Sequence, residues 1–158
     1  MRKVVKKSKP KRGYCFIHKI KLYSTNLILY YGNPKDCLSI VKKSIKKLKK
    51  NVRDEVVDFL VRYIGGPDNT SPYFCTQLNV SDAEWIFIHV GDDECITNTE
   101  QLGTLLHECL HAAIYIARTR GIRDDNFGHE ALVYLTEYIF TYFLDKIKKS
   151  LYKKHKLK

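Results

Sequence analysis

The stretch HECLH, residues 107–111, decides how the rest of this chain is interpreted. Residues four apart on an α-helix project from the same face, so His107 and His111 can bind one metal ion together. Zinc accepts imidazole nitrogens at about 2.0–2.1 Å, and two such ligands one turn apart supply half of a tetrahedral site. Glu108 lies beside them and is placed to accept a proton from a zinc-bound water. The stretch therefore predicts a helix that carries a zinc site and a catalytic base.

The residues around this motif are apolar on nearly every side of the expected helix, which predicts that the helix is buried. They are Thr104, Leu105, Leu106, Leu110, Ala112, Ala113, Ile114 and Ile116. The alternative to a metal site is a pair of hydrogen-bonded core histidines with Glu108 exposed to solvent. Metal binding is the stronger interpretation, because buried polar groups without partners are costly and a chance HExxH occurs in only about one such chain in a hundred.

A third ligand is expected further along the chain, where residues 126–138 are NFGHEALVYLTEY. Glu130 follows His111 with eighteen residues between them, which gives HExxH-x18-E. His129 directly precedes Glu130, and both residue types are accepted zinc ligands. Neighbouring helical residues point about 100° apart, so the two side chains cannot both face one ion.

The HExxH-x18-E spacing resembles the gluzincin metallopeptidases, in which a glutamate on the next helix completes the zinc site. More narrowly, TLLHECLHAAI (104–114) followed by HEALVYLTEYI (129–139) resembles small zinc metallopeptidases encoded by bacteriophages. The resemblance covers residues 99–142 and implies a zincin-like fold that hydrolyses peptide bonds. It implies His107, His111 and Glu130 as zinc ligands and Glu108 as the general base. His129 is then an alternative ligand, or a residue that hydrogen-bonds one of the ligands.

Two other side chains are candidates for stabilising the oxyanion that develops during hydrolysis. Tyr134 lies one turn beyond Glu130, and His89 lies on a predicted strand; a packing role is the simpler interpretation of each. Two other functional classes stay open. HExxH with a later Gly128-His129 and a basic surface is similar to the SprT/Spartan family, which cleaves proteins crosslinked to DNA. A phage structural or accessory protein would keep zinc only for stability, although such a site has no need of Glu108.

The composition predicts one globular domain, because 158 residues with 44% apolar content can bury a core. Its net charge of +11 is concentrated in a basic arm at residues 1–13, a basic tail at residues 150–158, and a helix face between Lys42 and Arg53. The domain itself is expected to span residues 14–149. The basic segments could contact nucleic acid or an acidic partner, but a solvated surface is the simpler interpretation. A protein or peptide substrate is the partner that the motif implies.

The five cysteines include no CxxC pair, which predicts reduced thiols in a cytoplasmic compartment. No apolar run approaches the roughly 18 residues of a membrane span, and the basic start is a poor signal peptide. The expected location is the cytoplasm, which is that of the host cell if a phage encodes the chain, or else the virion.

The predicted elements are strands at 14–23, 27–31, 73–78 and 84–90, and helices at 34–64, from 97 or 98 to Gly121, and from 124–126 to about 149. Asn33 and Pro34 are expected to start the first helix. This order predicts an α+β domain: a small mixed sheet, a backing helix, the HExxH helix and a C-terminal ligand helix.

Overall fold

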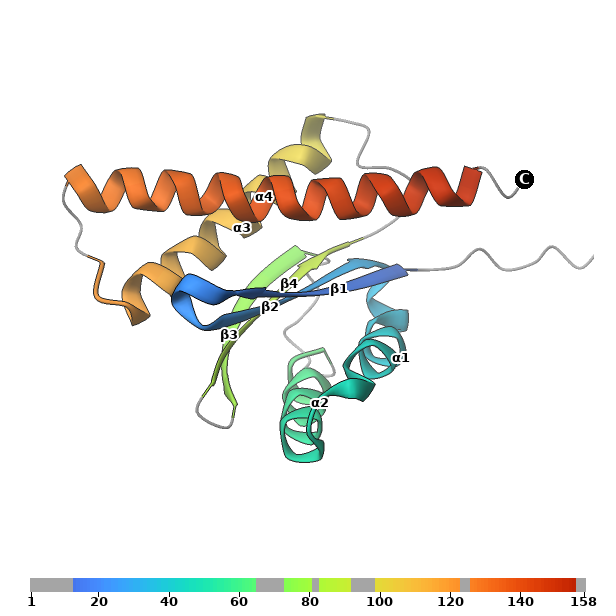
Figure 1. Cartoon of the computed structure of the whole chain (residues 1–158). Helices are drawn as coiled ribbons and strands as arrows, with labels where there is room; N and C mark the ends of the chain where they lie inside the picture. The colour runs from blue at the N-terminus through green and yellow to red at the C-terminus, as the bar shows by residue number, and fades with distance from the viewer. Residues whose placement is uncertain (1–12, 65–72, 81–82, 92–98, 123–125, 156–158) are drawn as a thin grey trace, which may run out of the picture.

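Two layers of helices enclose a four-stranded mixed sheet in the computed structural model of the chain, which describes residues 13–64, 73–80, 83–91, 99–122 and 126–155 (Figure 1). The α+β class and the mixed sheet are thus as predicted. The strands are β1 (Gly13–Ile20), β2 (Thr25–Gly32), β3 (Tyr73–Val80) and β4 (Ala83–Val90). The helices of the described part are α1 (Pro34–Ser44), α2 (Lys50–Ile64), α3 (Thr99–Thr119) and α4 (Asn126–His155), with short 3-10 turns η1 (Lys21–Tyr23) and η2 (Ile45–Lys47).

The sheet order is β1-β2-β4-β3, in which two antiparallel hairpins join through the parallel pair β2 and β4. Both central strands are covered on both faces, so nearly all of their residues are buried. In β2, Leu27 and Leu29 face α3 and α4, while Ile28 and Tyr30 face α1 and α2. Residues of β4 alternate in the same way between the two helix layers. The two cores are therefore separated by the sheet.

The expectation of one continuous helix over residues 34–64 was wrong. The helix stops at Ser44, passes through η2, and turns at Leu48, whose backbone is extended with φ −73° and ψ 156°. A straight helix of that length would span about 46 Å, whereas an eight-residue strand spans about 26 Å. Breaking the helix lets both halves bury apolar residues on the same sheet face, such as Val41 in α1 and Val56 in α2.

Most predicted helix ends agree with the structure. The Asn33 side chain accepts a hydrogen bond from the Lys35 backbone N–H (2.9 Å) with Pro34 in the first turn, and Gly121 has φ +65° after α3. The alternative caps at residues 97 and 98 lie outside the described residues. α4 continues to His155, so part of the predicted tail is helical. No described helix is long and apolar enough to cross a membrane.

A buried glutamate ties the end of α3 to the sheet. Glu84, at the start of β4, accepts hydrogen bonds from Thr25 (2.6 Å), Gln77 (2.9 Å) and Thr119 (2.8 Å). Arg120 lies 3.5 Å from the same carboxylate. These partners come from β2, β3 and the C-terminal end of α3, so one charge positions three elements.

Replacing Glu84 with alanine should lower the free energy of unfolding by about 3 kcal/mol or more, because the change removes a buried charged group and leaves its hydrogen-bond donors without an acceptor. Urea denaturation measures this loss. The matched control is Asp54→Ala, which removes an exposed carboxylate 3.4 Å from Arg53 and should cost less than about 1 kcal/mol. Equal losses in the two variants would show that Glu84 does not hold these elements together.

Candidate functional site

One face of α3 packs on the sheet and leaves another face open. The buried side chains of this helix that join the core are Leu105, Cys109, Ala112, Ala113 and Ile116. On another side, Leu106 and Leu110 remain 44% and 38% exposed. The expectation of a helix buried all round was therefore wrong, because only the sheet and α4 cover α3 in the described part of the chain.

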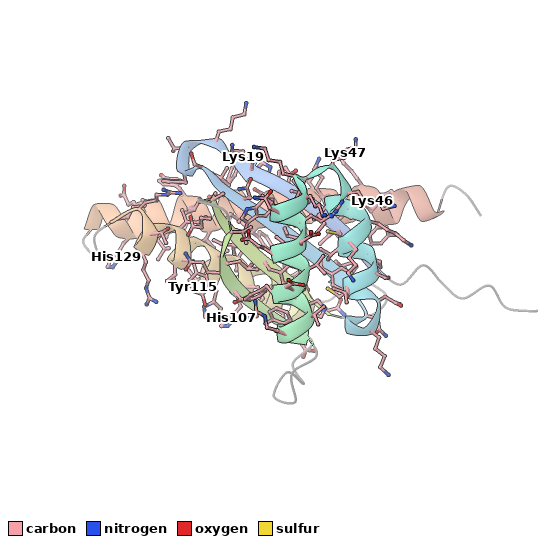
Figure 2. The ribbon with its side chains drawn as sticks, turned by 90° about the horizontal axis from the view of Figure 1, so that it is seen from below. Lys19, Lys46, Lys47, His107, Tyr115 and His129 are labelled. Atoms are coloured by element: carbon pink, nitrogen blue, oxygen red, sulfur yellow. The ribbon has the colours of Figure 1, made fainter. Side chains whose placement is uncertain are left out.

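The two histidines of the motif lie together on the exposed side of α3, where Figure 2 labels His107. The Nε2 atoms of His107 and His111 are 3.0 Å apart, and their rings meet edge to face with centroids 4.6 Å apart. Two imidazole nitrogens on one tetrahedral zinc ion would be about 3.3 Å apart. Burial, and then the positive charge of His107, lowers the pKa of His111, which favours the neutral imidazole that a metal requires. The pair therefore fits two positions of a zinc site.

Glu108 points to the other side and is only 5% exposed. Its Oε2 atom is buried and has no hydrogen-bond partner among the described residues. Burial raises the pKa of Glu108, and the charge of His107 partly opposes this shift. The charge of Glu108 in turn contributes, after burial, to a raised pKa of the Cys75 thiol on β3. The alternative of core histidines with an exposed glutamate was wrong about burial, because the histidines are exposed and Glu108 is buried, although the two histidines are within hydrogen-bond distance of each other as it expected.

An open groove of about 510 Å³ lies between α3 and α4 beside His107. Its lining is mainly apolar and consists of Gly103, Leu106, His107, Leu110, Leu132, Val133, Thr136, Glu137 and Phe140. Glu137 is the acidic residue of this groove. The motif spacing points to residues 129 and 130 instead, so Glu137 was not among the predicted ligands. The observation that identifies it is the way α4 crosses α3 (Figure 1).

The two predicted third ligands lie at different places on α4. His129 lines a neighbouring cavity with Ile114, Ala117 and Arg118, which shares Leu132 with the groove beside His107. Arg118 lies seven residues beyond His111, or about 10 Å along the helix axis. Figure 2 accordingly shows Tyr115 between His107 and His129.

Glu130 is exposed and lies three residues before Val133 of the His107 groove. Among the described residues, no three histidine, cysteine, aspartate or glutamate side chains come together as a metal-binding group. The structure thus brings His107 and His111 together, places Glu108 on the buried side of the same helix, and leaves the third ligand as a prediction.

The two candidate oxyanion donors lie away from the histidine pair. Tyr134 lines a different groove, on the side of α4 that faces the β1–β2 hairpin. His89 lies on the sheet face that packs against α1 and α2, where its ring contacts Tyr30 and Phe74 with centroids 5.1 and 5.2 Å away. Its Nε2 atom donates to the carbonyl of Gly32 at 3.2 Å. Neither residue lines the groove beside His107.

Free thiols were predicted from the cysteine pattern, and the structure agrees for the residues it describes. Cys15, Cys37, Cys75 and Cys109 are unpaired. Cys95 lies outside the described residues. Burial raises the pKa of Cys15 to about 11, and it also raises the pKa of Cys109. These buried thiols are therefore protonated at neutral pH and are poor metal ligands or nucleophiles.

Comparisons with protein-family models, with curated proteins and with solved structures found no match to this chain. Its resemblance to phage-encoded metallopeptidases therefore depends on the two motifs within residues 99–142.

His89 makes the stability of the fold depend on pH. Burial lowers the pKa of His89 to about 4, against a hydrogen bond to Gly32 that raises it. An unfolded histidine has a pKa of about 6.5, so between these values the unfolded chain binds a proton that the folded chain excludes. The free energy of unfolding should fall by about 3 kcal/mol as the pH falls from 6.5 to 4.

His89→Gln, which keeps a donor but does not titrate, should remove this contribution. The measurement is urea denaturation of both proteins at several pH values between 4 and 8. The expected result is that the variant becomes more stable relative to the wild type as the pH falls. A difference between the two that stays constant with pH would contradict this assignment.

Proposed function

We propose that the chain is a zinc-dependent metallopeptidase of the zincin type. The observation that carries the proposal is the division of the HExxH helix into two sides. Two imidazole nitrogens lie 3.0 Å apart on the exposed side, and the Glu108 carboxylate on the buried side has an oxygen without a hydrogen-bond partner among the described residues. A structural histidine pair has no use for such a carboxylate, because an unpaired buried acid lowers stability.

His107 and His111 hold the metal in this proposal. When bound, zinc supplies a Lewis acid and lowers the pKa of water at the site. Both histidines lie on one long helix whose opposite face is fixed on the sheet, so their spacing is set before any metal arrives. Such pre-organisation reduces the cost of binding.

Glu108 acts as the general base. It accepts a proton from the water that attacks the scissile carbonyl, and it returns the proton to the leaving amine. A general base works best when its pKa is close to the working pH. Burial, which raises the pKa of Glu108 above the ordinary value for a glutamate, moves it in that direction.

Glu130 is the proposed third ligand. By helical spacing it shares a stripe of α4 with Val133 and Glu137, both of which line the groove beside His107. His129 points about 100° away from that stripe and lines the cavity beside Arg118. This arrangement supports Glu130 over His129, and it therefore gives no support to the SprT-like alternative with three histidines.

The groove beside His107 suits part of a peptide substrate. Its apolar residues are Leu106, Leu110, Leu132, Val133 and Phe140. An apolar side chain of the substrate placed there would bury surface from both partners, at about 25 cal/mol for each Å² removed from water. We therefore expect cleavage next to large apolar residues.

Glu108→Gln tests the proposal. The variant should keep its zinc and its melting temperature, because glutamine has nearly the same shape, while peptide cleavage should fall by about a hundredfold or more. Cleavage is measured by mass spectrometry of a mixture of unstructured peptides incubated with zinc-loaded protein. Zinc content is measured by atomic absorption.

The matched control is Glu100→Gln, which changes an exposed glutamate at the start of the same helix and should alter neither zinc content nor cleavage. Full activity in Glu108→Gln would remove Glu108 from the mechanism. A zinc-loaded wild-type protein that cleaves none of the peptides would count against the peptidase assignment itself.

A further inference from the structure

A second open groove, of about 670 Å³, lies on the other side of α4. The β1–β2 hairpin with η1 forms one wall, and the first half of α4 forms the other (Figure 1). Its lining residues are His18, Lys19, Ile20, Lys21, Leu22, Tyr23, Ala131, Tyr134, Leu135 and Tyr138. We call it the tyrosine groove. It shares no lining residue with the groove beside His107, so it is a separate surface.

Aromatic rings are unusually accessible in the tyrosine groove. Tyr134 and Tyr138 are 69% and 46% exposed, and they lie one turn apart on α4, or about 6 Å along its axis. The hydroxyl of Tyr138 lies 2.8 Å from His18 Nε2. The His18 ring is in turn stacked on Tyr142, with centroids 3.8 Å apart and an interplanar angle of 25°. These contacts hold Tyr138 in place before a ligand arrives.

The charge of the tyrosine groove is positive. Lys19 and Lys21 belong to its hairpin wall, and no aspartate or glutamate lines it among the residues that the structure describes. At the far end of the same aromatic row, Lys146 lies over the Tyr142 ring at 5.1 Å from the centroid. Flat rings beside lysines form a surface that attracts a polyanion with planar groups.

We propose that the tyrosine groove binds single-stranded nucleic acid. Bases stack on Tyr134 and Tyr138, and Lys19 and Lys21 attract the neighbouring phosphates. Stacking on aromatic side chains tolerates any base sequence, because every base has a flat face. The bases of a duplex are already stacked on one another, so they are not available to stack on the two tyrosine rings. An acidic peptide would satisfy the lysines but would leave both rings in water.

The basic helix face from Lys42 to Arg53 is a less suitable surface. Its lysines are exposed on α1, η2 and the start of α2, as expected from the sequence, but no aromatic residue interrupts them. It can attract phosphate only through charge. Figure 2 shows Lys46 and Lys47 on η2, whereas Lys19 lies on β1. These two lysines therefore supply a control that removes the same charge elsewhere.

The test is fluorescence anisotropy of the full chain with labelled twelve-nucleotide oligo-dT and oligo-U, at two salt concentrations. A duplex of the same length and a polyglutamate peptide serve as competitors. Tyr134→Ala/Tyr138→Ala should weaken binding to the oligonucleotides at least tenfold, as expected for the loss of two stacked bases. Tyr134→Phe/Tyr138→Phe keeps both rings and should bind within about twofold of the wild type, provided that circular dichroism shows each variant folded.

The lysine variants distinguish binding in the tyrosine groove from non-specific electrostatic attraction to the protein surface. Lys19→Ala/Lys21→Ala should weaken binding and reduce its salt dependence, because fewer counterions are released. Lys46→Ala/Lys47→Ala should weaken binding less and should change its salt dependence less than Lys19→Ala/Lys21→Ala does. Comparable effects of the two lysine pairs, unchanged binding by the alanine variant of the tyrosines, or competition by duplex or polyglutamate as strong as by unlabelled oligonucleotide would each overturn the proposal.

Discussion

The burial of one face of α3 against the sheet is the constraint on which the candidate site depends. Helical geometry then fixes the remaining directions, because successive residues turn by about 100°. His107 and His111 lie about 40° apart on the open side, and Glu108 lies about 100° from His107, toward β3. The carboxylate of Glu84 fixes the far end of the same helix through Thr119 and Arg120. A rotation of α3 would therefore disturb the core, the Glu84 contacts and the histidine pair together.

The burial of Glu108 carries a local cost in stability. A buried acid with an oxygen that lacks a partner among the described residues is destabilising unless another group completes its contacts. Two apolar cores, one on either side of the sheet, contribute the burial that offsets such a cost. Features that break the rules of packing in this way are concentrated at functional sites. The burial of Glu108 and the exposure of its two histidine neighbours are together more informative than the motif alone.

Local patterns in the sequence predicted much of the fold. The four strands, the mixed sheet, the Asn33 cap and the Gly121 helix end follow from alternation, turn residues and capping chemistry. The break at Leu48 was missed because the length of the opposing sheet, and not the helical pattern itself, requires it.

Less of the candidate site follows from the sequence. Spacing within one helix predicted that His107 and His111 lie side by side, as they do, whereas the roles of the site residues stay predictions. The crossing of α3 and α4 decides which residues meet across the helices, so Glu137 could not be found from spacing. The tyrosine groove likewise joins His18 to Tyr138, which are 120 residues apart in sequence.

Anomalous diffraction at the zinc absorption edge, from crystals of the wild-type protein grown with zinc, would locate the metal directly. We expect one peak about 2.0–2.1 Å from the Nε2 atoms of both His107 and His111. We also expect a carboxylate of α4, that of Glu130, as the third ligand, with Glu108 beside the ion but not bound to it. A fully occupied zinc ion elsewhere, or no peak between the two histidines, would show that His107 and His111 do not form a zinc site.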